Sequence, residues 1–99
     1  MTTLTELSLE AEAALEKFAW GRPNAEAISF FNDMAEKMRA VPPGWAFEKI
    51  ARMQSWARIL YSAQEHVKYP DGATGVRHFL RCDLTLMRNI DRRYQRTAA

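Results

Sequence analysis

The chain has 99 residues, of which 47% are hydrophobic and 26% charged, a composition typical of one globular domain rather than of a disordered segment. A single cysteine, Cys82, excludes an internal disulfide, and no run reaches the ~20 apolar residues of a membrane span. The net charge is +2, but residues 1–36 hold seven acids and two bases (net −5), whereas residues 37–99 hold five acids and twelve bases (net +7). We expect one cytoplasmic domain, residues 1–99, in which the two halves attract each other or a charged partner.

The N-terminal part of the chain predicts two helices of similar length. The first spans about residues 4–19, where Thr3 and Glu6 have the spacing of a capping box. Its polar face is acidic and holds Glu6, Glu10, Glu12 and Glu16. The second spans about residues 25–40, with Asn24 as the expected N-cap. The prolines at positions 42 and 43 end it, because proline disfavours helix before it.

The C-terminal part predicts two longer helices. The third spans about residues 45–67 and has an apolar face wide enough to contact two or three neighbours. The fourth spans about residues 75–94, with Thr74 as its expected cap, and we expect the tail after it to fray. No segment shows the alternation typical of strands. The sequence therefore predicts an all-α fold, most simply a compact up-and-down four-helix bundle.

Arginines recur along one side of the last helix and form the most specific surface pattern. The row contains Arg77, Arg81, Arg88, Arg92 and Arg96, and its spacing places it opposite the apolar stripe of that helix. Guanidinium groups in a row can bind an acidic protein surface or the phosphates of nucleic acid. They can equally form a solvated face that also meets the acids of the first helix. No helix-turn-helix pattern accompanies the row.

Asp83 falls in the middle of the apolar stripe of the same helix. A buried carboxylate is unfavourable unless it is paired, so we expect an ion pair with a base such as Lys49. The alternative is that the stripe is incompletely buried and that Asp83 marks a groove for a partner. A catalytic carboxylate is the least favoured interpretation, because no second acid or histidine lies at a useful spacing.

Three soft metal ligands lie near one another in the sequence. His78 and Cys82 share a helix face, and His66 precedes the short turn before that helix. Zinc sites with strong signatures have paired ligands at both ends of a loop, and here there is one pair. The sequence also lacks a nucleophile elbow and a phosphate-binding glycine loop. We therefore expect no metal, no cofactor and no enzymatic activity.

The three tryptophans have different expected roles. Trp56 lies beside the inner stripe of its helix, so we expect it in the core. Trp20 and Trp45 lie at helix ends next to breaks, where exposure is more common. Since tryptophan is enriched at binding hot spots, both are candidates for contact with a partner.

No run of residues resembles a known family. The chain resembles one class of proteins only in its general properties. A very small helical protein with segregated charge is similar to phage-encoded blockers of host machinery, of which anti-CRISPR proteins are one group. The likeness implies a protein that occludes a surface of a larger partner, such as a nucleic-acid-handling complex, through the acidic face of the first helix, the arginine row, Trp20 and Trp45. Two alternatives remain open: a nucleic-acid-binding accessory protein that uses the arginines, and a homodimeric bundle that uses the apolar face of the third helix.

Overall fold

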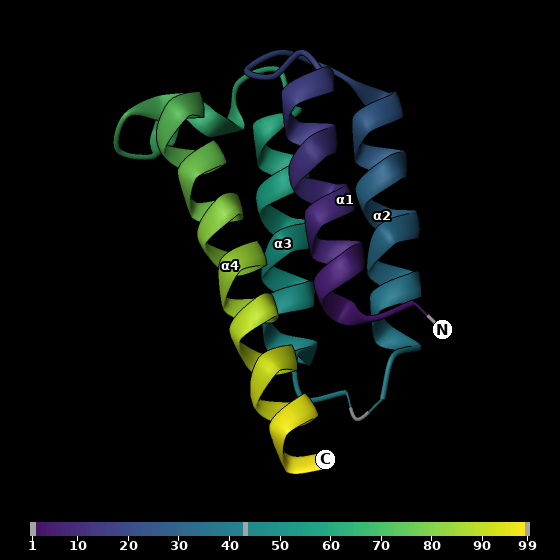
Figure 1. Cartoon of the computed structure of the whole chain (residues 1–99). Coiled ribbons are helices and arrows are strands. Elements are labelled where there is room, and N and C mark those ends of the chain that lie inside the picture. Colours follow the sequence, from purple (N-terminus) through teal and green to yellow (C-terminus); the bar gives the residue numbers. More distant parts are fainter. Residues whose placement is uncertain (1, 43, 99) are drawn as a thin grey trace.

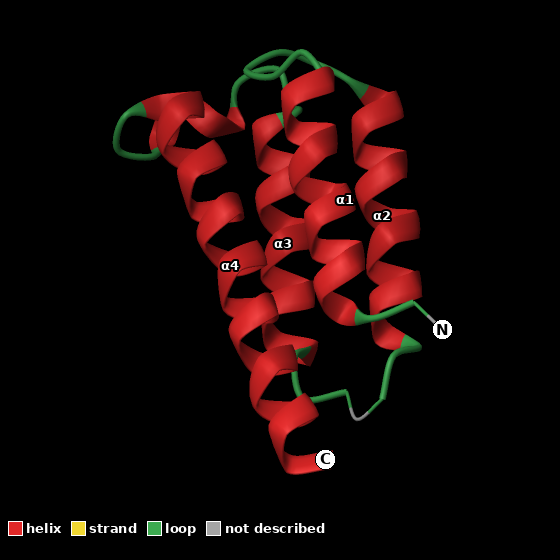
Figure 2. Ribbon diagram, viewed as in Figure 1, coloured by secondary structure: helices red, strands yellow, loops and turns green. Residues whose placement is uncertain are grey.

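The computed structural model of the chain describes residues 2–42 and 44–98, and Met1, Pro43 and Ala99 lie outside them. The helices are α1 (Leu4–Lys17), α2 (Ala25–Arg39), α3 (Phe47–Leu60), the short 3-10 helix η1 (Glu65–Lys68) and α4 (Gly72–Ala98). The described residues contain no strand, so the predicted all-α class is confirmed (Figure 2). In this part of the chain, none of the helices combines the length and the apolarity that a bilayer span requires.

Consecutive helices run up and down, as predicted (Figure 1). Helix α1 packs between α2 and α4, and α3 contacts the same two helices from the other side. Helix η1 lies against α3 and α4 at the end where the two helices connect. With 27 residues, α4 is the longest helix, and its C-terminal turns extend beyond the ends of its neighbours (Figure 1).

The N-terminal caps of α1 and α2 are those that the sequence predicts. The Thr3 side chain accepts a hydrogen bond from the backbone N–H of Glu6 at 3.1 Å, and that of Asn24 accepts one from Ala27 at the same distance. Each cap satisfies a backbone donor that has no partner within its helix. The two helices end one or two residues before their expected ends.

Helix α3 is much shorter than the predicted range of residues 45–67. Ser62 explains its end, because the hydroxyl donates to the Ile59 carbonyl at 2.6 Å and accepts from the Glu65 N–H at 3.0 Å. A serine that bonds the local backbone in this way competes with helix propagation. The helix also begins after Trp45, and Val67, at the end of the predicted range, is 66% exposed.

Helix α4 starts and ends outside the predicted range of residues 75–94. It begins at Gly72, so Thr74 lies within the helix and does not cap it. Gly75 permits this start, because a Cβ at that position would lie 2.0 Å from the carbonyl oxygen of Pro70. The tail that we expected to fray is helical up to Ala98.

Each of the four α-helices contributes a stripe to one hydrophobic core. The largest fully buried side chains are Tyr61, Phe31, Leu15, Met34, Met38, Ile50, Met53, Leu60, Leu80, Leu84, Met87 and Val76. The inner stripe of α3 is therefore covered within the chain, whereas Phe47, at the start of this helix, is 67% exposed. In the described part of the chain, the buried polar side chains are Ser8, His66, Asp83 and Asp91.

Candidate functional site

The N-terminal half of the arginine row meets the acids of α1, as one interpretation of the row predicted, and part of it packs against that helix instead of being fully solvated. Arg77 donates to Glu16 at 2.7 Å. Arg88 donates to the buried hydroxyl of Ser8 at 2.9 Å and lies 3.5 Å from Glu12. The Arg77 and Arg88 side chains are only 16% and 19% exposed. These two arginines therefore join α4 to α1.

Arg81 lies between them on the same face and is less constrained. Its Nε atom is 4.0 Å from the Glu12 carboxylate, and its side chain is 49% exposed. Arg81 therefore remains accessible to a partner, although Glu12 offsets its charge. With Glu12 and Glu16 opposite three arginines, the surface formed by these helices, the α1–α4 face, is close to electrically balanced.

The α1–α4 face has an open hollow of about 610 Å³. Its lining consists of Glu12 from α1 and of His78, Arg81, Cys82, Thr85 and Leu86 from α4. Leu86 is 40% exposed, and Leu9, one turn before Glu12 on α1, is 49% exposed. The face thus combines a concave surface with two apolar side chains that the core does not cover.

The remaining predicted charges lie apart from this hollow. Glu6 and Glu10 are exposed on α1, and neither forms an ion pair among the described residues. Arg92 and Arg96 are exposed on the last turns of α4, and within the described chain each also lacks an acidic partner. The structure therefore brings together Glu12 and Glu16 with the first three arginines of the row, but not the whole acidic face with the whole row.

Asp83 is buried, but its ion-pair partner differs from the prediction. Its Oδ1 atom lies 3.6 Å from Nε of Arg52, whereas Lys49 acts on it only at longer range. Burial raises the pKa of the Asp83 carboxyl, and the charges of Arg52 and Lys49 and the indole N–H of Trp56 lower it in part. Neither Oδ2 of Asp83 nor Nε1 of Trp56 completes a hydrogen bond of standard geometry.

The tryptophans lie in three different environments. Trp56 is half-buried and stacks on Phe79 at 5.1 Å, so it packs against the core as predicted. Trp20 is 39% exposed, and the Arg77 guanidinium lies 5.4 Å from its ring. Trp45 is 51% exposed and meets Tyr94 of α4 edge-on at 5.4 Å. Trp20 and Trp45 lie at opposite ends of the bundle, so one compact partner surface cannot easily cover both.

His78 and Cys82 are neighbours on the exposed side of α4, with Nε2 and Sγ 3.5 Å apart. His66, which could have been a third ligand, is buried on η1. In the described ranges, no three His, Cys, Asp or Glu side chains converge as metal ligands would. The pair therefore contributes a polar patch to the hollow of the α1–α4 face.

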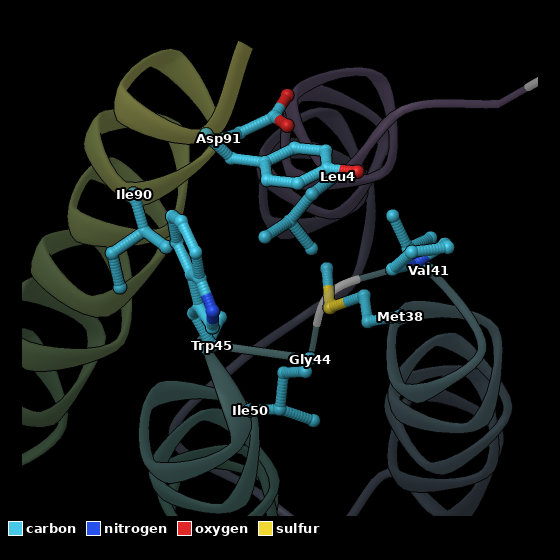
Figure 3. Close-up of a pocket in the computed structure, with 11 residues that line it drawn as sticks. Leu4, Met38, Val41, Gly44, Trp45, Ile50, Ile90 and Asp91 are labelled. Carbon is cyan, nitrogen blue, oxygen red and sulfur yellow. The ribbon is translucent and has the colours of Figure 1, made fainter. Parts of the chain in front are cut away.

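The end of the bundle where α1 begins also contains a small gap, which Figure 3 shows between Leu4, Met38, Trp45 and Ile90. The gap measures about 10 Å³, room for about one water molecule and for no larger ligand. It therefore belongs to the packing of the core.

Sequence reasoning missed two features of the α1–α4 face. Ser8 donates to the Leu84 carbonyl at 2.8 Å and fixes the separation of the two helices. The hollow depends on how the helices pack, so the spacing of residues along the sequence does not predict it. The exposed Leu86 was the available signal, because it lies to one side of the apolar stripe.

Comparison of the chain with protein-family models, with curated proteins and with solved structures gives no match.

Proposed function

We propose that the protein binds a larger protein through the α1–α4 face and acts by occluding a surface of that partner. The observation that supports this proposal is the open hollow of about 610 Å³ that the exposed Leu86 lines. Concave apolar surface with an arginine at its edge is typical of protein interfaces. Leu9, Arg81 and Leu86 are the side chains that we expect to contact the partner.

The balance of charge on this face favours a protein over a polyanion. Glu12 lies within 4.0 Å of both Arg81 and Arg88, and Glu16 bonds Arg77. A phosphate chain on this face would have to compete with these carboxylates, whereas a protein can present both charges and apolar groups. In its sharpest form, the proposal is inhibition of a nucleic-acid-handling complex by coverage of one of its protein surfaces.

The test is affinity capture from bacterial lysate, with and without nuclease, comparing the wild type with the double variant Arg81→Glu and Leu86→Asp. A matched control changes another exposed base and another exposed apolar residue, Arg22→Glu and Val67→Asp. All three proteins should give the same helical circular dichroism, because the altered side chains lie outside the core.

We expect a stoichiometric protein that the wild type and the control retain and that the Arg81/Leu86 variant loses. Equal retention by the Arg81/Leu86 variant would show that the α1–α4 face is not the binding site. Loss of all captured protein on nuclease treatment would contradict direct protein binding. A doubled mass of the purified protein in light scattering, abolished in the same variant, would instead assign the face to a second copy of the chain.

A further inference from the structure

His78 and Cys82 lie one turn apart on the exposed side of α4, so their side chains extend from the same face of the helix. Nε2 of His78 is 3.5 Å from Sγ of Cys82. Imidazole nitrogen and thiolate sulfur are both ligands that zinc prefers. Cys82 is a free and exposed cysteine, so its sulfur is available to an ion from solvent.

The separation of these two atoms is the one that a tetrahedral zinc ion requires. Such an ion binds a thiolate sulfur at about 2.3 Å and an imidazole nitrogen at about 2.0 Å, which at the tetrahedral angle places the two ligand atoms about 3.5 Å apart. The observed distance of 3.5 Å therefore needs no movement of the helix. In the absence of an ion the same contact is a weak hydrogen bond between thiol and imidazole, so the metal takes the place of one proton.

The surroundings of the pair leave space for an ion and do not repel it strongly. Both residues line the open hollow of about 610 Å³ on the α1–α4 face. Arg81 lines the same hollow, but its Nε atom lies 4.0 Å from the Glu12 carboxylate, which offsets its positive charge. In the described part of the chain, no third His, Cys, Asp or Glu completes a metal-binding group with the pair. Two of the four positions of a tetrahedral ion therefore stay open to water.

We propose that His78 and Cys82 bind one zinc ion in an open site within this hollow. Nε2 of His78 and Sγ of Cys82 are the protein ligands, and water occupies the other two positions. The thiol loses its proton to solvent as the zinc–sulfur bond forms, so each ion that binds releases one proton. Closed structural zinc sites supply four protein ligands, so this site should exchange its ion more readily than they do. The proposal goes beyond the proposed protein binding, because the site needs no partner.

The test titrates cobalt(II) and then zinc into the reduced full-length protein, prepared without a histidine tag. Cobalt bound to a thiolate absorbs in the near ultraviolet by charge transfer, and zinc should remove this band because it binds such ligands more tightly. We expect one ion per chain, and the association constant for zinc should rise several-fold from pH 7 to pH 8 because binding releases a proton. Cys82→Ser should abolish the band. His78→Ala should weaken zinc binding at least about tenfold, because even groups that only orient a ligand contribute that much.

The matched control is Thr85→Ala, which changes an exposed residue that lines the same hollow but carries no preferred ligand for zinc. Its affinity for zinc should equal that of the wild type. Absence of the charge-transfer band, unchanged zinc affinity in His78→Ala, or an equal loss in Thr85→Ala would each overturn the proposal. One ion per two chains, with a doubled mass in light scattering, would overturn the one-chain site in favour of a site between two copies. The assay uses the purified protein alone, so its result is separable from that of the protein capture.

Discussion

Asp91, near the end of α4, accepts hydrogen bonds from both the backbone N–H and the hydroxyl of Thr5 in the first turn of α1. The two distances are 3.1 Å and 2.7 Å, and the carboxylate is 5% exposed. The start of α1 has unpaired backbone donors and a partial positive charge, both of which a carboxylate satisfies. Asp91 therefore acts as a second cap for α1, supplied by a residue 86 positions away.

Replacing Asp91 by alanine should destabilise the fold by about 1–3 kcal/mol, because the partly buried donors of Thr5 lose a charged acceptor. Urea unfolding followed by circular dichroism measures the difference. The exposed Asp33, replaced in the same way, should change the free energy of unfolding by less than about 0.5 kcal/mol. Equal effects of the two substitutions would show that Asp91 contributes no more than a surface charge.

Replacing Arg88 and Arg81 by alanine should separate a structural arginine from an accessible one. Arg88→Ala leaves the buried oxygen of Ser8 without its donor at 2.9 Å and should cost about 1–2 kcal/mol. Arg81→Ala removes a half-exposed contact at 4.0 Å and should cost less than about 0.5 kcal/mol. The measurement is again urea unfolding, and a larger loss for Arg81 than for Arg88 would reverse the roles that we assign.

Replacing Asp83 by asparagine should stabilise the protein at neutral pH by on the order of 1 kcal/mol. Burial raises the pKa of this carboxyl above its ordinary value of 3.8, so the folded protein binds the proton more tightly than the unfolded chain does. The stability that protonation contributes is complete below pH 3.8 and is lost as the pH rises through the folded-state pKa.

Unfolding free energies measured from pH 3 to pH 7 check this sign. The advantage of Asp83→Asn over the wild type should be greatest at pH 7 and should shrink toward acid. The exposed Asp33→Asn substitution should show no such trend. A wild type that is more stable than Asp83→Asn at pH 7 would mean that the pair with Arg52 outweighs the desolvation of the carboxyl.

Replacing Tyr61 by phenylalanine should leave the stability unchanged or raise it by up to about 1 kcal/mol. The ring is 1% exposed between aromatic neighbours, and among the described residues its hydroxyl has no hydrogen-bond partner. Tyr61→Ala should cost about 3–5 kcal/mol, because it removes the same ring and leaves a cavity. A large loss in the phenylalanine variant would reveal a partner for the hydroxyl.

Tyr61 should also be recognisable by its titration. Burial raises its pKa to about 12, against a smaller opposing effect of the Arg77 charge. Absorbance at about 295 nm should therefore show one of the three tyrosines ionising well above the ordinary value near 10. This late step should disappear in Tyr61→Phe, whereas three tyrosines that all titrate near pH 10 would mean that water reaches the hydroxyl.

Local patterns predicted the caps of α1 and α2 correctly, whereas the cap predicted for α4, Thr74, was wrong because that helix begins at Gly72. Thr3 and Asn24 cap α1 and α2 because a cap depends on a side chain and a backbone donor only three residues apart. The end of α3 was predicted wrongly, because apolar spacing continues to Val67 whereas Ser62 ends the helix. The predicted partner of Asp83 was Lys49, whereas the structure pairs Asp83 with Arg52. The sequence could not predict this choice, because the contact depends on the register between α3 and α4.

The sequence by itself determined the all-α class, the positions of the four helices and the burial of their apolar stripes, because these follow from short-range periodicity and capping. The tertiary structure decided which charges remain free. Packing of α4 against α1 pairs Arg77 and Arg88 with groups on α1, leaves Arg92 and Arg96 in solvent and opens the hollow beside Leu86. Helical spacing shows which residues share a face, but only the packed bundle shows which neighbouring helix covers that face.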